Sequence, residues 1–212
     1  MKGIFIVMEG PDGSGKSTQI RLLQDFLQAE GYDCIVTREP GGTKIGEAVR
    51  NVILNPDYEE MSDVTEMLLY AASRAQLMAE VIEPALQAGK VVISDRFVDS
   101  SMVYQGIARG LGAETVSAVN APGIGSCRPD CIFFIDIPEE EGLRRKQRQK
   151  KLDRIEKEAV EFHAMVSEGY RKILADRDEV IHVDGTEPVE QIQGVIRDEV
   201  LRRLSDRTPE KV

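Results

Sequence analysis

The sequence predicts an α/β fold in which helices cover both faces of a five-stranded parallel sheet. Five short apolar segments, each about the length of a buried strand, alternate with segments of helical periodicity. Right-handed crossover connections leave few topologies open to such a chain. The 212 residues suit one domain and contain no repeat or low-complexity linker, so residues 1–212 are expected to form a single domain. The predicted strands are Ile4–Met8, Cys34–Thr37, Val91–Asp95, Cys131–Asp136 and Val180–Val183.

The first predicted strand leads into a glycine-rich turn that ends in Lys16 and Ser17, and a helical pattern follows. This arrangement is typical of a loop that binds the phosphates of a nucleoside triphosphate. Lys16 can reach the β and γ phosphates, and Ser17 can ligate the Mg²⁺ ion that bridges them. A structural turn with a chance lysine is the alternative, and the flanking strand and helix favour the phosphate loop. The residues expected to bind ATP are Gly10, Pro11, Asp12, Gly13, Ser14, Gly15, Lys16, Ser17 and Thr18.

Two helices and a loop are expected next. The loop after the second strand contains Arg38 and Glu39, and it is forced by Pro40 and two glycines. Arg50 is expected to lie off the apolar face of the helix that follows. The apolar face of the first helix comprises Ile20, Leu22, Leu23, Phe26 and Leu27, and that of the second comprises Ile45, Val49, Val52 and Ile53.

Ser62 and Asp63 are expected to cap a third helix. Tyr70 and Arg74 share one face of this helix, and on spacing alone a surface aromatic beside a solvated arginine is the favoured interpretation. Pro84 either starts a new turn or kinks the helix, and both alternatives stay open. The apolar positions of this helix are Met67, Leu68, Ala71, Ala72, Leu77 and Met78.

The third strand ends in Asp95, where a carboxylate commonly supports the metal beside a phosphate loop. Arg96 follows at the strand end, where open parallel sheets bind ligands. A structural ion pair is the alternative, but the phosphate loop favours a functional role. A short helix is then expected from Asp99 to a closing Gly106. The last helix carries Val189, Ile192, Val195, Ile196, Val200 and Leu204 on its apolar side.

Composition limits the partners and the compartment. A net charge of −10 argues against a nucleic-acid polymer as partner, because such binding neutralises many phosphates. No apolar run is long enough to span a bilayer, and no signal peptide is apparent, so no membrane association and a cytoplasmic location are expected. Cys34, Cys127 and Cys131 fit no zinc pattern and are expected to be buried or incidental thiols.

Residues 144–154 read RRKQRQKKLDR, a cationic segment in an otherwise acidic chain. Such a run is usually a solvated helix face. In a phosphoryl-transfer enzyme it can instead be a lid whose arginines stabilise charge on the transferred group and exclude water. We expect a lid over residues 142–157, with Arg154 as the first candidate for a catalytic arginine and Arg148 as the second.

Four further segments resemble the thymidylate kinase family. They are Thr37-Arg38-Glu39-Pro40-Gly41-Gly42, Tyr70-Ala71-Ala72-Ser73-Arg74, Asp95-Arg96-Phe97 with Asp99-Ser100-Ser101 and Tyr104-Gln105-Gly106, and Leu152-Asp153-Arg154-Ile155-Glu156. Their order and spacing match from near residue 3 to beyond residue 200. Gly13 in the loop, with basic residues moved to the lid, is similar to the bacterial type.

The resemblance implies Mg²⁺-dependent transfer of the ATP γ-phosphoryl group to dTMP, giving dTDP and ADP in dTTP biosynthesis, by an enzyme that is commonly a homodimer. It implies that Arg96 holds the phosphates of both substrates and that Arg50 holds the monophosphate. The residues implied at the nucleoside are Tyr70 stacked on thymine, Arg74 and Gln105 at the base edge, Ser101 beside them, Tyr104 where a ribose 2′-hydroxyl would lie, and Asp12 near the 3′-hydroxyl.

These residue types suit that chemistry. Gln105 offers a donor and an acceptor, which match O4 and N3–H of thymine, whereas cytosine reverses the pair. Positioning and charge stabilisation can carry the transfer without a protein nucleophile. We therefore expect Tyr70, Arg74, Arg96 and Gln105 to line one cavity that faces Lys16.

Two alternatives remain at this point. A kinase of the same fold that acts on another monophosphate would not need the set at the base edge. A nucleotide-dependent switch without an acceptor is less favoured, because the chain has no Asn-Lys-x-Asp guanine motif.

Overall fold

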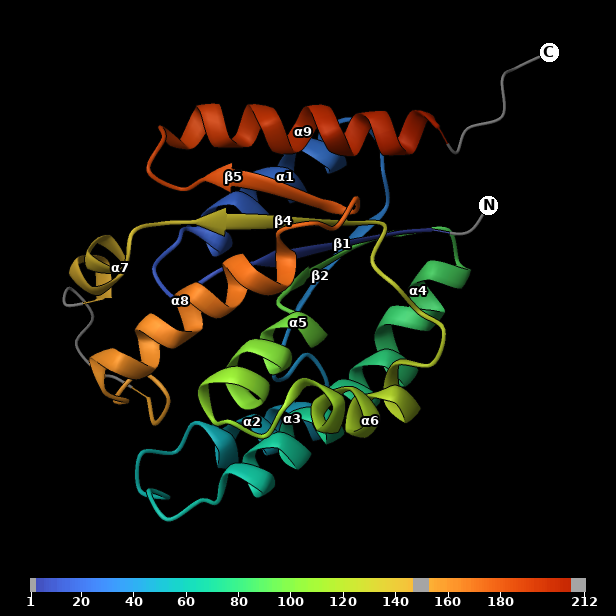
Figure 1. The fold of residues 1–212 in the computed structure, drawn as a ribbon. Coiled ribbons are helices and arrows are strands. Elements are labelled where there is room, and N and C mark those ends of the chain that lie inside the picture. Colours follow the sequence, from blue (N-terminus) through green and yellow to red (C-terminus); the bar gives the residue numbers. More distant parts are fainter. Residues whose placement is uncertain (1–2, 147–152, 207–212) are drawn as a thin grey trace.

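The computed structural model describes residues 3–146 and 153–206. Its centre is a five-stranded parallel sheet with the order β2-β3-β1-β4-β5, and helices lie on both faces (Figure 1). The predicted α/β fold is therefore confirmed. The strands are β1 Ile4–Glu9, β2 Cys34–Arg38, β3 Val91–Asp95, β4 Cys131–Asp136 and β5 Val180–Asp184.

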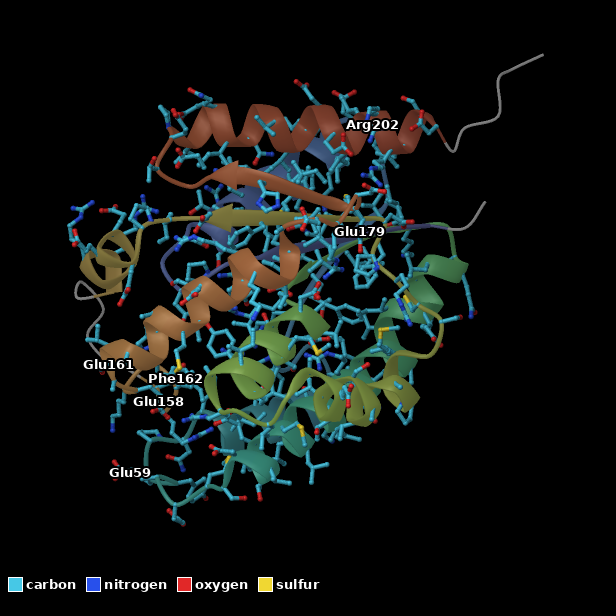
Figure 2. The ribbon with its side chains drawn as sticks, viewed as in Figure 1. Glu59, Glu158, Glu161, Phe162, Glu179 and Arg202 are labelled. Carbon is cyan, nitrogen blue, oxygen red and sulfur yellow. The ribbon has the colours of Figure 1, made fainter. Side chains whose placement is uncertain are left out.

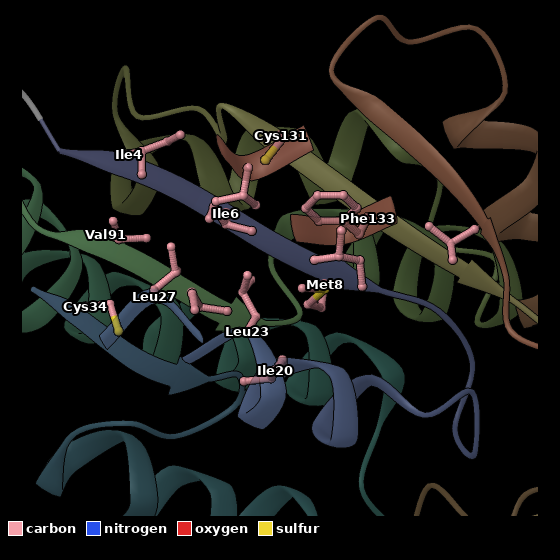
Figure 3. Packing of buried hydrophobic residues seen from close by; sticks show 14 of the residues in the cluster. Ile4, Ile6, Met8, Ile20, Leu23, Leu27, Cys34, Val91, Cys131 and Phe133 are labelled. Carbon is pink, nitrogen blue, oxygen red and sulfur yellow. The ribbon is translucent and has the colours of Figure 1, made fainter. Parts of the chain in front are cut away.

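The central strand β1 is buried along its whole length because helices cover it on both sides. Its alternate residues point to opposite faces, as the pleat requires. Ile4, Ile6 and Met8 join one core cluster, which Figure 3 shows, and Phe5 and Val7 join another on the opposite face. The continuous apolar run of this strand thus supplies both cores.

Helices α1 (Lys16–Ala29) and α9 (Val189–Ser205) cover the first face of the sheet. Their buried side chains include Ile20, Leu23 and Leu27 from α1 and Ile192, Ile196 and Val200 from α9. Val189 and Val195 are exposed, so the predicted apolar side of α9 was too wide.

Helices α2 (Lys44–Ile53) and α3 (Asp63–Leu77) pack against each other. Ser62 caps α3, because its hydroxyl accepts a hydrogen bond from Thr65 N at 3.2 Å, as predicted. The predicted apolar faces of these helices are wrong in part. Ile53, Met67, Leu77 and Met78 are buried, whereas Ile45, Val52, Leu68 and Ala72 are exposed.

The chain runs from α3 through the π-helical turn η1 (Met78–Ile82) directly into α4 (Glu83–Gln87). Pro84 lies in the first turn of α4, where its missing N–H is tolerated. The prediction that Gly106 closes a short helix is wrong. Helix α5 (Val98–Ser101) continues through the π-helical segment η2 (Met102–Ala108), and Gly106 is internal to it.

Three further helices cover the second face and its approaches. Figure 1 shows α8 crossing this face and α7 beside the start of the phosphate loop. Tyr170, Phe162 and Val166 of α8 form a core cluster with Val103 and Phe134. These helices are α6 Ala113–Ile124, α7 Glu139–Lys146 and α8 Val160–Leu174.

Cys34, Cys127 and Cys131 are free and buried, in agreement with the expected buried or incidental thiols. Within the described part of the chain, no group of three or more His, Cys, Asp or Glu side chains is arranged to hold a metal ion. A search of the same residues for a helix long and apolar enough to cross a bilayer finds none.

Candidate active site

A cavity of about 410 Å³ lies at the carboxyl edge of the sheet, between the phosphate loop and the ends of β2 and β3. It brings together most of the residues predicted for the two substrates. Those that line it are Asp12, Gly13, Gly15, Lys16, Ser17, Thr18, Arg50, Tyr70, Asp95, Arg96, Ser101, Tyr104 and Gln105. Gly10, Pro11, Ser14, Arg74 and Arg154 do not line it, and Arg148 lies outside the described residues.

The phosphate loop depends on glycine where the backbone is left-handed or closely approached. Gly10 has φ 144°, and a Cβ there would lie 2.5 Å from the carbonyl oxygen of Ile135. Gly13 has φ 80°, and a Cβ there would lie 3.1 Å from the carbonyl oxygen of Gly142 in α7. The absence of a side chain at Gly13 thus lets α7 approach the loop.

Lys16 is buried at the start of α1 and donates hydrogen bonds to the carbonyl oxygens of Gly10 at 2.9 Å and Pro11 at 3.0 Å. Burial, together with the nearby Arg96, lowers its pKa to about 8, although three carboxylates act in the opposite direction. An ammonium group with so little hydration is well suited to bind a phosphate oxygen.

Ser17 and Asp95 converge at the mouth of the loop, where the Ser17 hydroxyl donates to Asp95 Oδ2 at 3.3 Å. Hydroxyl and carboxylate oxygens are the ligand types that Mg²⁺ prefers, and this ion commonly takes its remaining ligands from water and substrate phosphates. The pair therefore fits the expected magnesium site.

Arg96 reaches into the cavity from a left-handed backbone conformation with φ 75°. Its guanidinium donates to Asp12 Oδ1 at 2.6 Å, to the Tyr170 hydroxyl at 2.6 Å and to Ser100 Oγ at 3.2 Å. It also lies 5.3 Å from the centre of the Tyr104 ring. Strained backbone that is fixed by so many contacts is typical of functional sites.

Glu9 is a buried residue of the site that the sequence did not reveal. It accepts hydrogen bonds from Ser100 Oγ at 2.7 Å, from the Tyr170 hydroxyl at 3.0 Å and from Phe97 N at 2.9 Å. Burial raises its pKa to about 7. Ser100 and Tyr170 also accept hydrogen bonds from Arg96, so Glu9 positions the arginine through these two hydroxyl groups.

Arg74 does not line the cavity, which corrects the expectation that four selected side chains would face it together. It is buried, with an ion pair to Glu39 at 2.6 Å and a bond to Ser101 Oγ at 3.0 Å. It also donates to Asn120 and to the carbonyl oxygen of Phe97. Arg74 therefore lies behind Ser101, which forms the cavity wall.

Arg38 and Arg50 bring two more cations to the cavity, although only Arg50 was predicted. Arg50 donates to the carbonyl oxygen of Pro40 at 2.8 Å, and Arg38 pairs with Glu47 at 2.8 Å. Arg38 ends β2, and the strand-end argument that identified Arg96 could have found it.

The described part of the predicted lid contacts the site at other positions than expected. Arg154 donates to Glu66 Oε2 at 2.5 Å and to the carbonyl oxygen of Ile53 at 2.8 Å, and it does not line the cavity. Arg145 of α7, which was not predicted, donates to the carbonyl oxygen of Gly13 at 3.1 Å. The part of the segment at the cavity wall comprises Asp153, Ile155 and Glu156.

A phosphate loop at the edge of a parallel sheet, with three arginines in the same cavity, is typical of the class of P-loop kinases that phosphorylate small phosphorylated acceptors. Residues 8–196 match the sequence model of one family in this class, described as thymidylate kinase. The chain belongs to the thymidylate kinase family.

Bacterial relatives support this membership over nearly the whole length. A thymidylate kinase of Caldanaerobacter subterraneus subsp. tengcongensis is 52% identical over 190 residues, which cover 89% of this chain and 90% of the relative. One from Geobacillus sp. (strain WCH70) is 44% identical over 211 residues, covering 98% and 100%. One from Exiguobacterium sibiricum is 45% identical over 208 residues, covering 98% of each.

Proposed function

We propose that the residues of this cavity carry the Mg²⁺-dependent transfer of the ATP γ-phosphoryl group to dTMP, giving dTDP and ADP. As a member of the thymidylate kinase family, the chain phosphorylates dTMP. The proposal assigns roles to its individual residues. Its main support is that the base-edge residues Tyr70 and Gln105 share one cavity with Lys16 and Arg96.

On the donor side, Lys16 and the backbone N–H groups of the loop bind the β and γ phosphates of ATP. Ser17 and Asp95 would hold the magnesium ion, with water and phosphate oxygens as its other ligands. When bound, the ion neutralises charge on the bridging phosphate oxygens. Residues 10–18 supply the rest of the ATP contacts.

On the acceptor side, Arg96 and Arg50 hold the monophosphate, and Arg38 adds a third cation at the same cavity. Arg96 contacts the loop through its ion pair with Asp12, so it can contact both phosphate groups. The reacting oxygen of dTMP is already ionised, so positioning and charge stabilisation suffice and no protein nucleophile is needed.

For the nucleoside, Tyr70 stacks on thymine and Gln105 reads its edge, with Ser101 beside them. Arg74 affects the base edge indirectly, because it donates to Ser101 Oγ and Ser101 forms the cavity wall. Tyr104 crowds the position of a ribose 2′-hydroxyl, and Asp12 lies near the acceptor 3′-hydroxyl.

The chain is proposed to form one domain with a lid over residues 142–157, of which 147–152 lie outside the described residues. Catalytic contacts from Arg154 and Arg148 stay predictions, and for Arg154 they require its guanidinium to leave Glu66. The cytoplasmic location also stays a prediction, in keeping with three free cysteines.

The active form is a homodimer, and its proposed contact surface is the exposed apolar face of α2 and α3. This face carries Ile45 and Val52 from α2 and Val64 and Leu68 from α3, with 40–56% of each side chain exposed. Exposed apolar side chains on two packed helices are unfavourable in water, and a second copy of the same face would cover them.

A panel of nucleoside monophosphates tests the assignment, with ADP release measured by a coupled assay. We expect turnover with dTMP to exceed turnover with CMP, AMP and GMP. We also expect Gln105→Ala to reduce the preference for dTMP over dCMP by at least tenfold, because the base loses one hydrogen bond and its polar group is left unpaired. Equal turnover of all monophosphates, or an unchanged preference in Gln105→Ala, would contradict the proposed base site.

A further inference from the structure

Glu66 of α3 is a buried carboxylate next to the base site, only 1% exposed, and it belongs to no motif that sequence analysis singled out. Its Oε1 accepts from Gln105 Nε2 at 2.8 Å and from Arg109 Nε at 3.3 Å. Its Oε2 accepts from Arg109 Nη2 at 3.1 Å and from Arg154 Nη2 at 2.5 Å. Both oxygens are therefore engaged by donors.

These contacts keep Glu66 ionised. Burial acts to raise its pKa, but the hydrogen bonds from Arg109, Gln105 and Arg154 outweigh burial and hold the pKa below its ordinary value. An ionised carboxylate can only accept hydrogen bonds. The amide nitrogen of Gln105, and not its oxygen, must therefore face Glu66.

The other half of the Gln105 amide is left without a partner. Gln105 lines the cavity and is 1% exposed, and its Oε1 is buried with no hydrogen-bond partner among the described residues. An unpaired buried acceptor costs free energy until a donor meets it. A ligand N–H group at this wall would supply that donor.

We propose that Glu66 is a positioning residue for base selection, which locks the Gln105 amide so that its oxygen, and not its nitrogen, faces the base. The inference rests on the proposed function, which seats thymine at this wall. Thymine then donates its N3–H to Gln105 Oε1. Cytosine presents an N3 lone pair at the same position, so two acceptors face each other and the amide cannot flip to relieve them.

The surroundings hold Glu66 itself in place. Arg109 extends from Glu66 to Glu158 at 2.5 Å, and its guanidinium lies 4.5 Å from the centre of the Phe162 ring. Figure 2 shows Glu158 and Phe162 close together near the start of α8. Asp63 adds a weaker contact to Arg109 at 3.4 Å. Segments far apart in the sequence thus fix the carboxylate that orients one amide.

The test compares kcat/KM for dTMP and dCMP in the wild type, Glu66→Gln and Gln105→Ala. A glutamine at position 66 can donate as well as accept, so the Gln105 amide is free to flip. We expect the dTMP/dCMP ratio to fall about tenfold in Glu66→Gln, chiefly through a lower KM for dCMP. Any change in Arg154 or in the lid affects both substrates alike and cancels in the ratio.

Arg109→Lys is the matched control, because it keeps a charged donor beside Glu66 and leaves the Gln105 contact in place. The dTMP/dCMP ratio of kcat/KM in this control should stay at the wild-type value. The double variant Glu66→Gln/Gln105→Glu reverses the pair, so that position 66 donates and position 105 accepts. Position 105 still presents an acceptor to the base, so the dTMP/dCMP ratio should recover. The exchange also tests the inference where Glu66→Gln alone fails to fold.

An unchanged ratio in Glu66→Gln, an equal fall in Arg109→Lys, or no recovery in the exchange variant would each overturn the role of Glu66. If Gln105→Ala keeps the wild-type ratio, the base site itself is wrong. If Gln105→Ala lowers the ratio and Glu66→Gln does not, the base site stands and only the orienting role of Glu66 fails.

Discussion

Arg96 adopts φ 75°, a backbone conformation that costs a residue other than glycine on the order of 1–3 kcal/mol. Its backbone is fixed on both sides, since its N–H donates to the carbonyl oxygen of Met8 at 2.9 Å and its carbonyl oxygen accepts from Ser94 Oγ at 2.8 Å. Asp12, Ser100 and Tyr170 then hold the guanidinium. The surrounding contacts therefore offset the strain and aim the charge at the cavity.

Replacing Glu9 with Gln should change how stability depends on pH. Burial, and next the charge of Asp99, raises the pKa of Glu9 from 4.5 to about 7, while Arg96 acts against this. Between these values the folded chain binds more protons here than the unfolded chain, so the stability from Glu9 is full below pH 4.5 and declines up to about pH 7. Across that range, Glu9→Gln should gain on the order of 3 kcal/mol relative to the wild type.

Urea unfolding of both proteins at pH 4.5, 6 and 8 measures this difference. Glu59→Gln, at an exposed carboxylate that Figure 2 labels, provides the control and should follow the wild type. A difference between Glu9→Gln and the wild type that is constant with pH would contradict the assignment of the titration to Glu9.

Binding of ATP should take up a proton above pH 8. Burial lowers the pKa of Lys16 to about 8, and a triphosphate beside the amine favours its charged form. The affinity for ATP should therefore fall as the pH rises beyond about 8. Calorimetry at pH 8.5 in two buffers of different ionisation enthalpy measures the proton uptake. Lys16→Arg, whose guanidinium stays charged, should show none, and equal uptake in both proteins would refute the prediction.

At the scale of elements, helix ends were more predictable than helix faces. The N-cap at Ser62 follows from local chemistry, because a hydroxyl there meets an unpaired N–H of the first turn. Gly106 shows the opposite case. A glycine can close a helix, but here the chain continues to Ala108, and Val116 of α6 lies only 3.5 Å from where a Cβ would be. The helix ends at Ala108, and the left-handed Gly110 that follows, with φ 72°, is the glycine that closes it.

Removal of the cap should destabilise the fold without changing catalysis. Ser62→Ala deletes the acceptor for Thr65 N and should cost about 1 kcal/mol in the free energy of unfolding. Ser205→Ala is the matched control, because the Ser205 hydroxyl donates to the carbonyl oxygen of Leu201 at an exposed helix end. Urea denaturation should give a lower free energy of unfolding for Ser62→Ala than for Ser205→Ala. Equal values in the two variants would argue against a capping role for Ser62.

At the scale of the whole molecule, the active-site cavity is assembled from segments that are far apart in the chain. Asp12 follows β1, Tyr70 comes from α3, Arg96 follows β3, Gln105 lies in η2, and Ile155 comes from the segment before α8. The parallel sheet brings strand ends to one edge, and the helices bring the base-site residues to that edge.

The proposed dimer can be tested at its apolar face. Leu68 is 51% exposed on this face, and Leu68→Glu would place a charge in both halves of a symmetric interface. We expect the dissociation constant to rise at least about a hundredfold, because each buried leucine contributes roughly 1.5–3 kcal/mol. Sedimentation velocity measures the shift. Val195→Glu, at a valine on α9 that is 45% exposed, should leave the wild-type distribution, and two identical distributions would exclude this face.

The sequence predicted the sheet, the phosphate loop and most cavity residues, because these depend on local patterns. Alternation of apolar segments defines the strands, and glycine spacing before Lys16 defines the anion site. The base site required the resemblance, since the spacing of Tyr70 and Arg74 alone favoured an exposed pair.

What the sequence by itself determined is the class of fold and the place of the phosphate chemistry, which follow from periodicity and from backbone geometry at glycine. Only the tertiary structure decided that Arg74 lies behind Ser101, that Arg154 points toward Glu66 and that Glu9 supports Arg96. The physical reason is that the orientation of a buried charged side chain is fixed by the groups that pair with it. Those partners come from distant segments, which one-dimensional spacing does not specify.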